Sequence, residues 1–239
     1  MKQSIRGAGA ARVHQGLGAL KSVPKAKSVA SYDQVQVLDH PVIQHKLCIL
    51  RDRKTSALGV RQVTDELSQF LAYEVTRDLK TMPKVIDTPI ERTTAQVVAE
   101  DLVLVAIMRA GNGMLAGMLK VLPFATVGHI GIYRDKFIES TVEYYLRFPK
   151  HIQGKRILLL DPLLATGDTA CAAMDRLKQY EVGAIRLVTL LAAPEGLTQV
   201  QARHPDVGVT TLSIERELND QGMILPGLGD AGNRLYDTL

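Results

Sequence analysis

The chain has 239 residues, enough for one large α/β domain, and its 46% hydrophobic and 23% charged residues are ordinary for a globular protein. No run reaches the roughly 18 apolar residues of a membrane-spanning helix, so we expect no membrane partner. Residues 1–32 hold six basic residues and no acidic ones, which leaves 23 basic against 25 acidic residues in the remainder. Because the remainder is close to neutral, the charge pattern argues against nucleic acid as a partner.

The first 32 residues differ in composition from the rest. They are rich in Gly, Ala, Ser and Lys, and we expect a basic, disordered N-terminal extension ahead of a single domain over residues 33–239. A basic segment without acids is also typical of organelle targeting, and that alternative stays open. The two cysteines, Cys48 and Cys171, lie far apart without metal-ligand spacing and favour a reducing, cytoplasmic compartment.

Helices and strands alternate along most of the chain. From Gly59 to Lys80 apolar residues recur every three or four positions, which predicts a long amphipathic helix. Five β-rich runs follow, at 102–108, 126–133, 157–160, 185–192 and 207–214. Helical stretches are predicted between them, at 113–122, 168–180 and 195–203. Continuous apolar strands alternating with helices predict a mostly parallel sheet covered on both faces.

A hairpin is predicted between Arg134 and Phe148. A charged turn, Arg134-Asp135-Lys136, is followed by the β-rich run from Thr141 to Phe148. We expect this segment to form an arm that projects from the sheet, with Tyr144 and Tyr145 packing on a partner subunit.

The segment 156–170 has the pattern of an anion-binding loop. A buried strand ends at Asp161, a short turn of small and hydroxyl residues follows, and then a helix begins. Ligands bind beyond the carboxyl ends of such strands, and the N–H groups that open a helix favour an anion. Gly167 allows close approach, Thr166 and Thr169 add hydroxyl donors, and Asp161 can accept hydrogen bonds from sugar hydroxyls. On spacing alone, an ordinary strand–turn–helix connection explains the pattern equally well.

The run from Asp161 to Thr169, Asp-Pro-Leu-Leu-Ala-Thr-Gly-Asp-Thr, resembles the phosphoribosyl-pyrophosphate loop of the uracil phosphoribosyltransferases. Six further segments match the family's pattern in the same order: His45–Asp52, Tyr73–Leu79, Met108–Gly111, Gly131–Asp135, Ala192–Gly196 with His204–Asp206, and Pro226–Gly232. The resemblance spans roughly residues 38–238. Seven ordered motifs are far more specific than any one of them.

The resemblance implies a type I phosphoribosyltransferase: a mostly parallel five-stranded sheet flanked by helices, with a small hood over the base and a protruding β-arm. The implied reaction forms UMP and pyrophosphate from uracil and 5-phosphoribosyl 1-pyrophosphate, without a covalent enzyme intermediate. The implied cofactor is Mg²⁺, held mainly by the substrate, so no metal site made by the protein is expected. The family also implies a homodimer or homotetramer, and leaves open whether GTP activates the enzyme.

The resemblance also assigns residues. Arg109, the Ala110-Gly111 turn and Arg134 would bind pyrophosphate, whose oxygens suit guanidinium groups. Around the 5′-phosphate and ribose it places Asp161, Pro162, Leu163, Leu164, Ala165, Thr166, Gly167, Asp168 and Thr169, with Asp230 on the same side. Uracil would be read by main-chain groups at Ile224, Gly229 and Ala231, next to Asp230. The implied catalytic set is Arg109, Arg134, Asp161 and Asp230.

The sequence departs from the family's usual residues at Leu58, Asn112, Asp168, Met223 and Asn233. Asp168 stands where the family usually has Gly, and so adds a negative charge beside the expected phosphate site. If its side chain points inward, affinity for the phosphoribosyl donor should fall. If it points outward, the effect should be small.

The sequence is compatible with two other functions. Gly111 to Ala116 fits the G-x-G-x-x-G/A pattern of NAD(P)-binding Rossmann enzymes, with Asp135 about 20 residues further on. That reading leaves residues 161–169 and 222–232 unexplained. A non-catalytic or regulatory relative that binds pyrimidine nucleotides is the other alternative.

Overall fold

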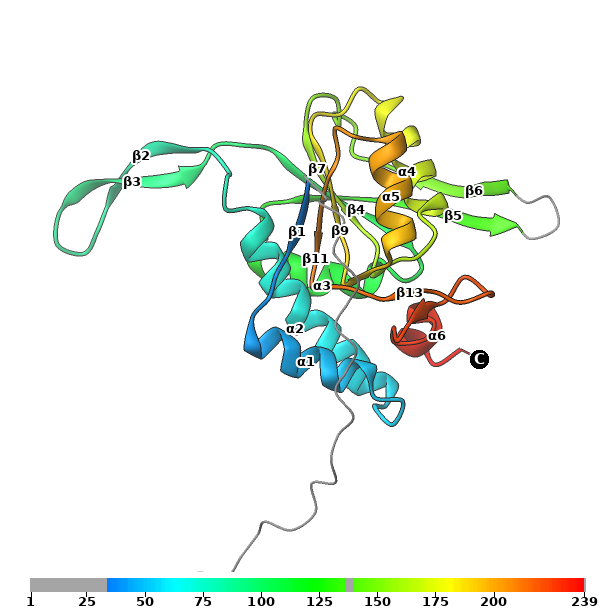
Figure 1. The fold of residues 1–239 in the computed structure, drawn as a ribbon. Coiled ribbons are helices and arrows are strands. Elements are labelled where there is room, and N and C mark those ends of the chain that lie inside the picture. Colours follow the sequence, from blue (N-terminus) through cyan, green and yellow to red (C-terminus); the bar gives the residue numbers. More distant parts are fainter. Residues whose placement is uncertain (1–33, 136–139, 239) are drawn as a thin grey trace, which may run out of the picture. The chain divides into compact units, whose positions relative to one another are not determined.

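A central sheet of seven strands organises the fold (Figure 1). In spatial order its strands are β1 (Val35–Val37), β11 (Gly208–Thr211), β9 (Ile185–Val188), β7 (Arg156–Leu160), β4 (Leu102–Met108), β5 (Thr126–Asp135) and β6 (Ser140–Arg147). All neighbours are parallel except β5 and β6. The mostly parallel sheet is therefore confirmed, but β1 and β6 extend it to seven strands rather than five.

This computed structural model describes residues 34–135 and 140–238, with only the backbone described at 134, 135, 140 and 141. All of them belong to one compact unit, Tyr32–Leu239. The expected N-terminal extension and its targeting alternative lie outside the described residues, as does Lys136 in the expected charged turn.

Two hydrophobic cores lie on the two faces of the sheet. Along β4, Leu102, Leu104 and Ala106 enter one core, and the residues between them enter the other, as the two-residue period of a strand requires. Helices α1 (Pro41–Arg51), α2 (Ala57–Val75) and α3 (Asn112–Val121) pack into the first core. Helices α4 (Asp168–Lys178) and α5 (Pro194–Arg203) pack into the second. Both faces are covered, as predicted.

Three strands break near their carboxyl ends and resume in a second, small sheet. The resumed strands are β8 (Leu163–Leu164), β10 (Leu191–Ala192) and β12 (Ser213–Ile214), which are parallel in the order β12-β10-β8. The expected strands 185–192 and 207–214 each span one such break. At the breaks, the buried hydroxyls of Thr189 and Thr211 bond the carbonyl oxygens of Leu191 and Ser213, at 2.9 and 3.1 Å. These local bonds compete with a continuous strand ladder.

The helix predicted from Gly59 to Lys80 ends five residues early. Helix α2 starts after Ser56, whose side chain accepts a hydrogen bond from the Gly59 N–H. It stops at Val75 because Thr76 turns the chain, its hydroxyl bonding the Ala72 carbonyl at 2.7 Å. Helices α1 and α6 (Ala231–Tyr236) were not predicted. In the described part of the chain, no helix combines the length and apolar character needed to cross a membrane.

Three hairpins complete the fold. The expected hairpin forms as β5 and β6, with β6 at the edge of the central sheet. A second hairpin, β2 (Thr81–Asp87) and β3 (Arg92–Val98), was missed, and it pairs outside the central sheet (Figure 1). Every residue of β2 is exposed. The third hairpin joins β13 (Glu217–Leu218) to β14 (Ile224–Leu225).

Candidate active site

A cavity of about 330 Å³ lies at the carboxyl ends of β4 and β7, where ligands bind in open α/β sheets. The described residues that line it are Ile107, Met108, Arg109, Ala110, Ile132, Asp161, Leu163, Leu164, Ala165, Thr166, Gly167, Thr169, Ala170 and Asp230. Only Ile107, Met108, Ile132 and Ala170 were not among the expected site residues. The cavity therefore joins the expected phosphate loop to Arg109 and Asp230.

The loop between β7 and α4 is fixed by its neighbours. The carbonyl oxygen of Pro162 accepts hydrogen bonds from the N–H groups of Leu190 and Leu191, at 3.0 and 3.2 Å. Gly167 adopts φ +91°, a conformation that favours glycine, and precedes the first residue of α4. The open N-terminus of an 11-residue helix is thus directed toward the cavity, where its N–H groups favour an anion.

Asp161 directly follows β7 and lines the cavity. Burial raises the pKa of its carboxyl group to about 7, and a hydrogen bond from the Leu163 N–H acts in the opposite direction. Near neutral pH this carboxyl group therefore exchanges between its neutral and its charged form.

The Asp168 side chain points away from the cavity, toward α5. Its carboxylate accepts hydrogen bonds from the Thr166 hydroxyl at 3.1 Å and from Gln199 Nε2 at 3.5 Å. This is the outward arrangement of the two considered for Asp168. It still affects the site, because the Thr166 hydroxyl donates to Asp168 and not into the cavity.

Arg109 follows β4 and is held by the C-terminal segment. Its guanidinium lies 5.8 Å from the centre of the Tyr236 ring and bonds Thr238 Oγ1 at 3.4 Å. The Tyr236 hydroxyl donates to the Arg109 carbonyl oxygen at 3.0 Å, and the peptide bond before Arg109 is cis. For Arg134, the second expected arginine, the structure gives the backbone within β5 but not the side chain.

Five other expected residues do not line the cavity: Gly111, Pro162, Ile224, Gly229 and Ala231. Gly111 is buried against the backbone, and a Cβ there would come within 2.4 Å of the Leu160 carbonyl oxygen. Pro162 is also buried. Of the four residues expected to contact uracil, Asp230 alone lines the cavity, and its side chain caps α6 by accepting the Asn233 N–H at 2.7 Å. Ile224 lies in β14, Gly229 has φ +81°, and Ala231 begins α6.

Sequence reasoning missed several residues around this site. Arg51 and Glu215 contact the loop before Asp230, as does Arg234, and Tyr236 supports Arg109. Arg51 stands in one of the matched segments, which was a usable signal, whereas nothing in the sequence distinguished Glu215.

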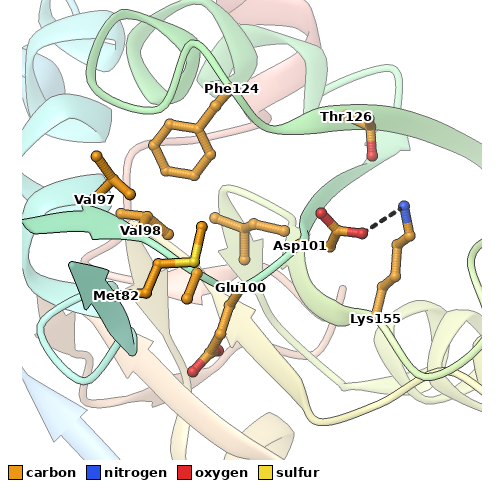
Figure 2. A pocket seen from close by; sticks show the side chains of 10 residues that line it. Met82, Val97, Val98, Glu100, Asp101, Phe124, Thr126 and Lys155 are labelled. Carbon is orange, nitrogen blue, oxygen red and sulfur yellow. Dashed lines mark ion pairs between the residues drawn. The ribbon is translucent and has the colours of Figure 1, made fainter. Parts of the chain in front are cut away.

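A larger cavity of about 540 Å³ lies at the base of the β2–β3 hairpin (Figure 2). One wall is apolar, with Met82, Val97, Val98 and Phe124. The other wall carries an ion pair between Lys155 and Asp101 at 3.2 Å. None of the expected site residues that the structure describes lines this cavity.

Comparison with known proteins identifies the family. A family model described as uracil phosphoribosyltransferase matches residues 37–238. The uracil phosphoribosyltransferases of Acidovorax ebreus and Legionella pneumophila (strain Lens) are 51% and 48% identical over 205 and 208 residues. These alignments cover 85% and 87% of this chain, and 98% and 97% of the relatives.

Solved structures agree. A protein from Aquifex aeolicus, 37% identical, superposes with a TM-score of 0.81 over 84% of this chain and 97% of its own. Adenine phosphoribosyltransferase from Leishmania donovani, only 14% identical, shares the fold, with a TM-score of 0.54 over 82% of this chain and 89% of its own. The ordered motifs, the cavity at the sheet's carboxyl edge and these matches lead to one conclusion: the chain belongs to the uracil phosphoribosyltransferase family.

Proposed function

We propose that the protein forms UMP and pyrophosphate from uracil and 5-phosphoribosyl 1-pyrophosphate. The observation that carries the proposal is the 330 Å³ cavity, which combines an open helix N-terminus, Arg109 and two carboxyl groups, Asp161 and Asp230. A phosphorylated sugar requires donors for its phosphates and acceptors for its hydroxyls, and both kinds of group face this space.

The reaction is a displacement at the anomeric carbon. A ring nitrogen of uracil bonds to that carbon as the bond between the carbon and the pyrophosphate oxygen breaks, and the proton of the nitrogen passes to water or to the released pyrophosphate. Arg109 stabilises the charge on the leaving pyrophosphate, the α4 N-terminus binds the 5′-phosphate, and Asp161 accepts from a ribose hydroxyl. Arg134 is proposed as a second cationic contact. Positioning accounts for much of the rate.

Mg²⁺ is the proposed cofactor. Carboxylate oxygens are ligands that Mg²⁺ prefers. Among the described residues that line the cavity, Asp161 and Asp230 are acidic, so the site fits an ion otherwise held by substrate and water. When bound, the ion would supply charge neutralisation for the pyrophosphate.

The test is synthesis of labelled UMP from uracil with Mg²⁺, with cytosine and hypoxanthine in parallel reactions. We expect product from uracil alone, and a rate at least 100-fold lower in Arg109→Ala, the order of loss seen when a transition-state charge contact is removed. No product with any base, together with tight UMP binding, would support the regulatory alternative. Adding GTP to the same assay tests activation, which stays a proposal.

We also propose a homo-oligomer, a dimer or a tetramer. The support is the β2–β3 hairpin and the wall beside it, where Met82, Ile86, Ile90 and Phe124 are exposed. Large apolar side chains gathered on a projecting element mark a protein interface. The exposed Tyr144 and Tyr145 offer further apolar surface. A cytoplasmic location is likewise proposed, supported by the two unpaired cysteines, and cell fractionation tests it.

A further inference from the structure

Arg51 and Glu215 form an ion pair that holds both main-chain polar groups of Gly227. The Arg51 guanidinium donates through Nη1 and Nη2 to the two carboxylate oxygens of Glu215, each at 2.6 Å. Arg51 Nη1 also bonds the Gly227 carbonyl oxygen at 3.0 Å, and the Gly227 N–H donates to Glu215 Oε2 at 3.0 Å. Arg51 and Glu215, which are distant in sequence, thus both bind the turn at Gly227 in the loop 222–232.

The pair is buried enough to act as a unit. The Glu215 side chain is 2% exposed and that of Arg51 is 25% exposed. Burial works to raise the pKa of Glu215, but hydrogen bonds from Arg51 and Ser213 outweigh it and hold the pKa below its usual range. Removal of one partner would leave the other charge unpaired in the interior, which is costly.

A second arginine fixes the next peptide. Arg234 Nη1 bonds the Leu228 carbonyl oxygen at 3.0 Å and also reaches the Leu50 carbonyl, while its Nη2 bonds the Asp52 carbonyl at 2.8 Å. Consecutive carbonyls of the loop are therefore tied to the C-terminal end of α1. Gly227 has φ +58°, and a Cβ there would lie 2.2 Å from the Ile224 carbonyl oxygen, so this turn folds directly onto Ile224.

We propose that Arg51 and Glu215 are positioning residues for base recognition, a role that rests on the proposed function. They fix the turn between Ile224 and Gly229, whose main-chain groups would read uracil. Neither side chain is among the described residues that line the cavity with the phosphate loop. Their loss should therefore weaken uracil binding and leave the phosphoribosyl donor largely unaffected.

The experiment compares KM for uracil, KM for 5-phosphoribosyl 1-pyrophosphate and kcat in Arg51→Met and Glu215→Gln. We expect KM for uracil to rise about tenfold or more and KM for the donor to change less than about twofold. Arg51→Lys keeps the positive charge but loses the bidentate contact. Its KM for uracil should therefore lie between those of the wild type and Arg51→Met. In the double variant Arg51→Met/Glu215→Gln, KM for uracil should be no higher than in either single variant, because the pair acts as a unit. The double variant also leaves no unpaired charge in the interior that could prevent folding.

The matched control is Lys46→Met, which removes an ion pair of 2.5 Å between α1 and α2 without touching the loop. Hydrogen exchange of the substrate-free protein should accelerate at residues 224–231 in Arg51→Met but not in this control. The proposal is overturned if KM for the donor rises with that for uracil, if the control reproduces the effect, or if folded variants keep the wild-type KM for uracil. If the wild-type protein does not form UMP, the proposed function is wrong, and this outcome is distinct from failure of the positioning role. Calorimetric binding of uracil and UMP to the same variants then decides the positioning role.

Discussion

The Asp161 carboxyl group, with its pKa raised to about 7 by burial, couples stability to pH. Below about pH 4 the group is protonated in both the folded and the unfolded chain. Between its ordinary pKa of 3.8 and about 7, the folded protein keeps a proton that the unfolded chain releases. The contribution of Asp161 to the free energy of unfolding therefore falls as pH rises through this window, by up to about 1.4 kcal/mol per pH unit, and stays constant above it.

The Asp161→Asn side chain cannot titrate, so this variant should not lose stability through Asp161 as pH rises. We expect its stability relative to the wild type to increase from about pH 4 to about pH 8 and then to level off, when followed by urea unfolding. Because all other titrating groups are shared, the difference between the two curves isolates Asp161. Parallel curves across this range would contradict the raised pKa.

The outward Asp168 side chain leads to a second prediction at the residue scale. Its carboxylate binds the Thr166 hydroxyl, which is therefore not free to donate to a phosphate. Asp168→Asn removes the charge beside the site and weakens this competition, so we expect KM for 5-phosphoribosyl 1-pyrophosphate to fall about threefold or more. The same change removes a favourable acid from the first turn of α4, at a cost of about 0.3–1 kcal/mol of stability.

Asp175→Asn is the control for that experiment. Asp175 lies on the same helix but pairs with Arg203, away from the cavity, so its loss should lower stability without changing KM for the donor. An unchanged or higher KM in Asp168→Asn would show that this residue does not limit donor binding.

At the scale of elements, the junction between β4 and α3 depends on Gly111. A Cβ at this position would meet the Leu160 and Ile107 carbonyl oxygens at 2.4 and 2.6 Å, and neither backbone can move without shifting a central strand. We expect Gly111→Ala to destabilise the protein by about 3 kcal/mol or more in chemical unfolding. Gly113→Ala is the comparison, because its Cβ would meet only the flexible end of Leu235. It should cost about 1 kcal/mol or less, and equal losses in the two variants would refute the packing argument.

An element can be predicted from the sequence when a clear pattern within its own segment specifies it. The buried strands β4 and β7 were predictable because continuous apolar runs have a clear period and length. The breaks after Val188 and Thr211 were not, because they depend on hydroxyl contacts between residues two positions apart. The β2–β3 hairpin was missed because its exposed strands mix polar and apolar residues without an alternating pattern.

The residues of the candidate site likewise fall into those that the sequence predicts and those that only the fold brings together. The phosphate loop is one continuous segment, so its residues could be named from the sequence and the cavity lies beside them. The Arg51–Glu215 pair joins positions 164 residues apart, and only the fold brings them together. The direction of the Asp168 side chain was also beyond the sequence, because it depends on Thr166 and on Gln199 of α5.

At the scale of the whole molecule, the exposed β2–β3 hairpin is the proposed contact between copies of the chain. Met82, Ile86 and Val97 share one face of β2–β3, because Met82 pairs with Val97 and Ile86 lies four residues along the same strand. Met82 and Val97 also line the larger cavity, so this face continues into its apolar wall (Figure 2). If two copies bury this face, a charge placed within it must separate them.

We therefore expect sedimentation equilibrium to give a wild-type mass at least twice that of one chain, and Ile86→Glu to lower it to that of a single chain. Gln96→Glu is the matched control, since it adds the same charge to the opposite face of the hairpin with almost no change in shape. The control should keep the wild-type mass. Dissociation by both variants would point to general repulsion, whereas an unchanged mass in Ile86→Glu would place the interface elsewhere, for example at Tyr144 and Tyr145. Because the larger cavity and the candidate active site share no lining residue in the part of the chain that the structure describes, a monomeric Ile86→Glu variant that still forms UMP would separate assembly from catalysis.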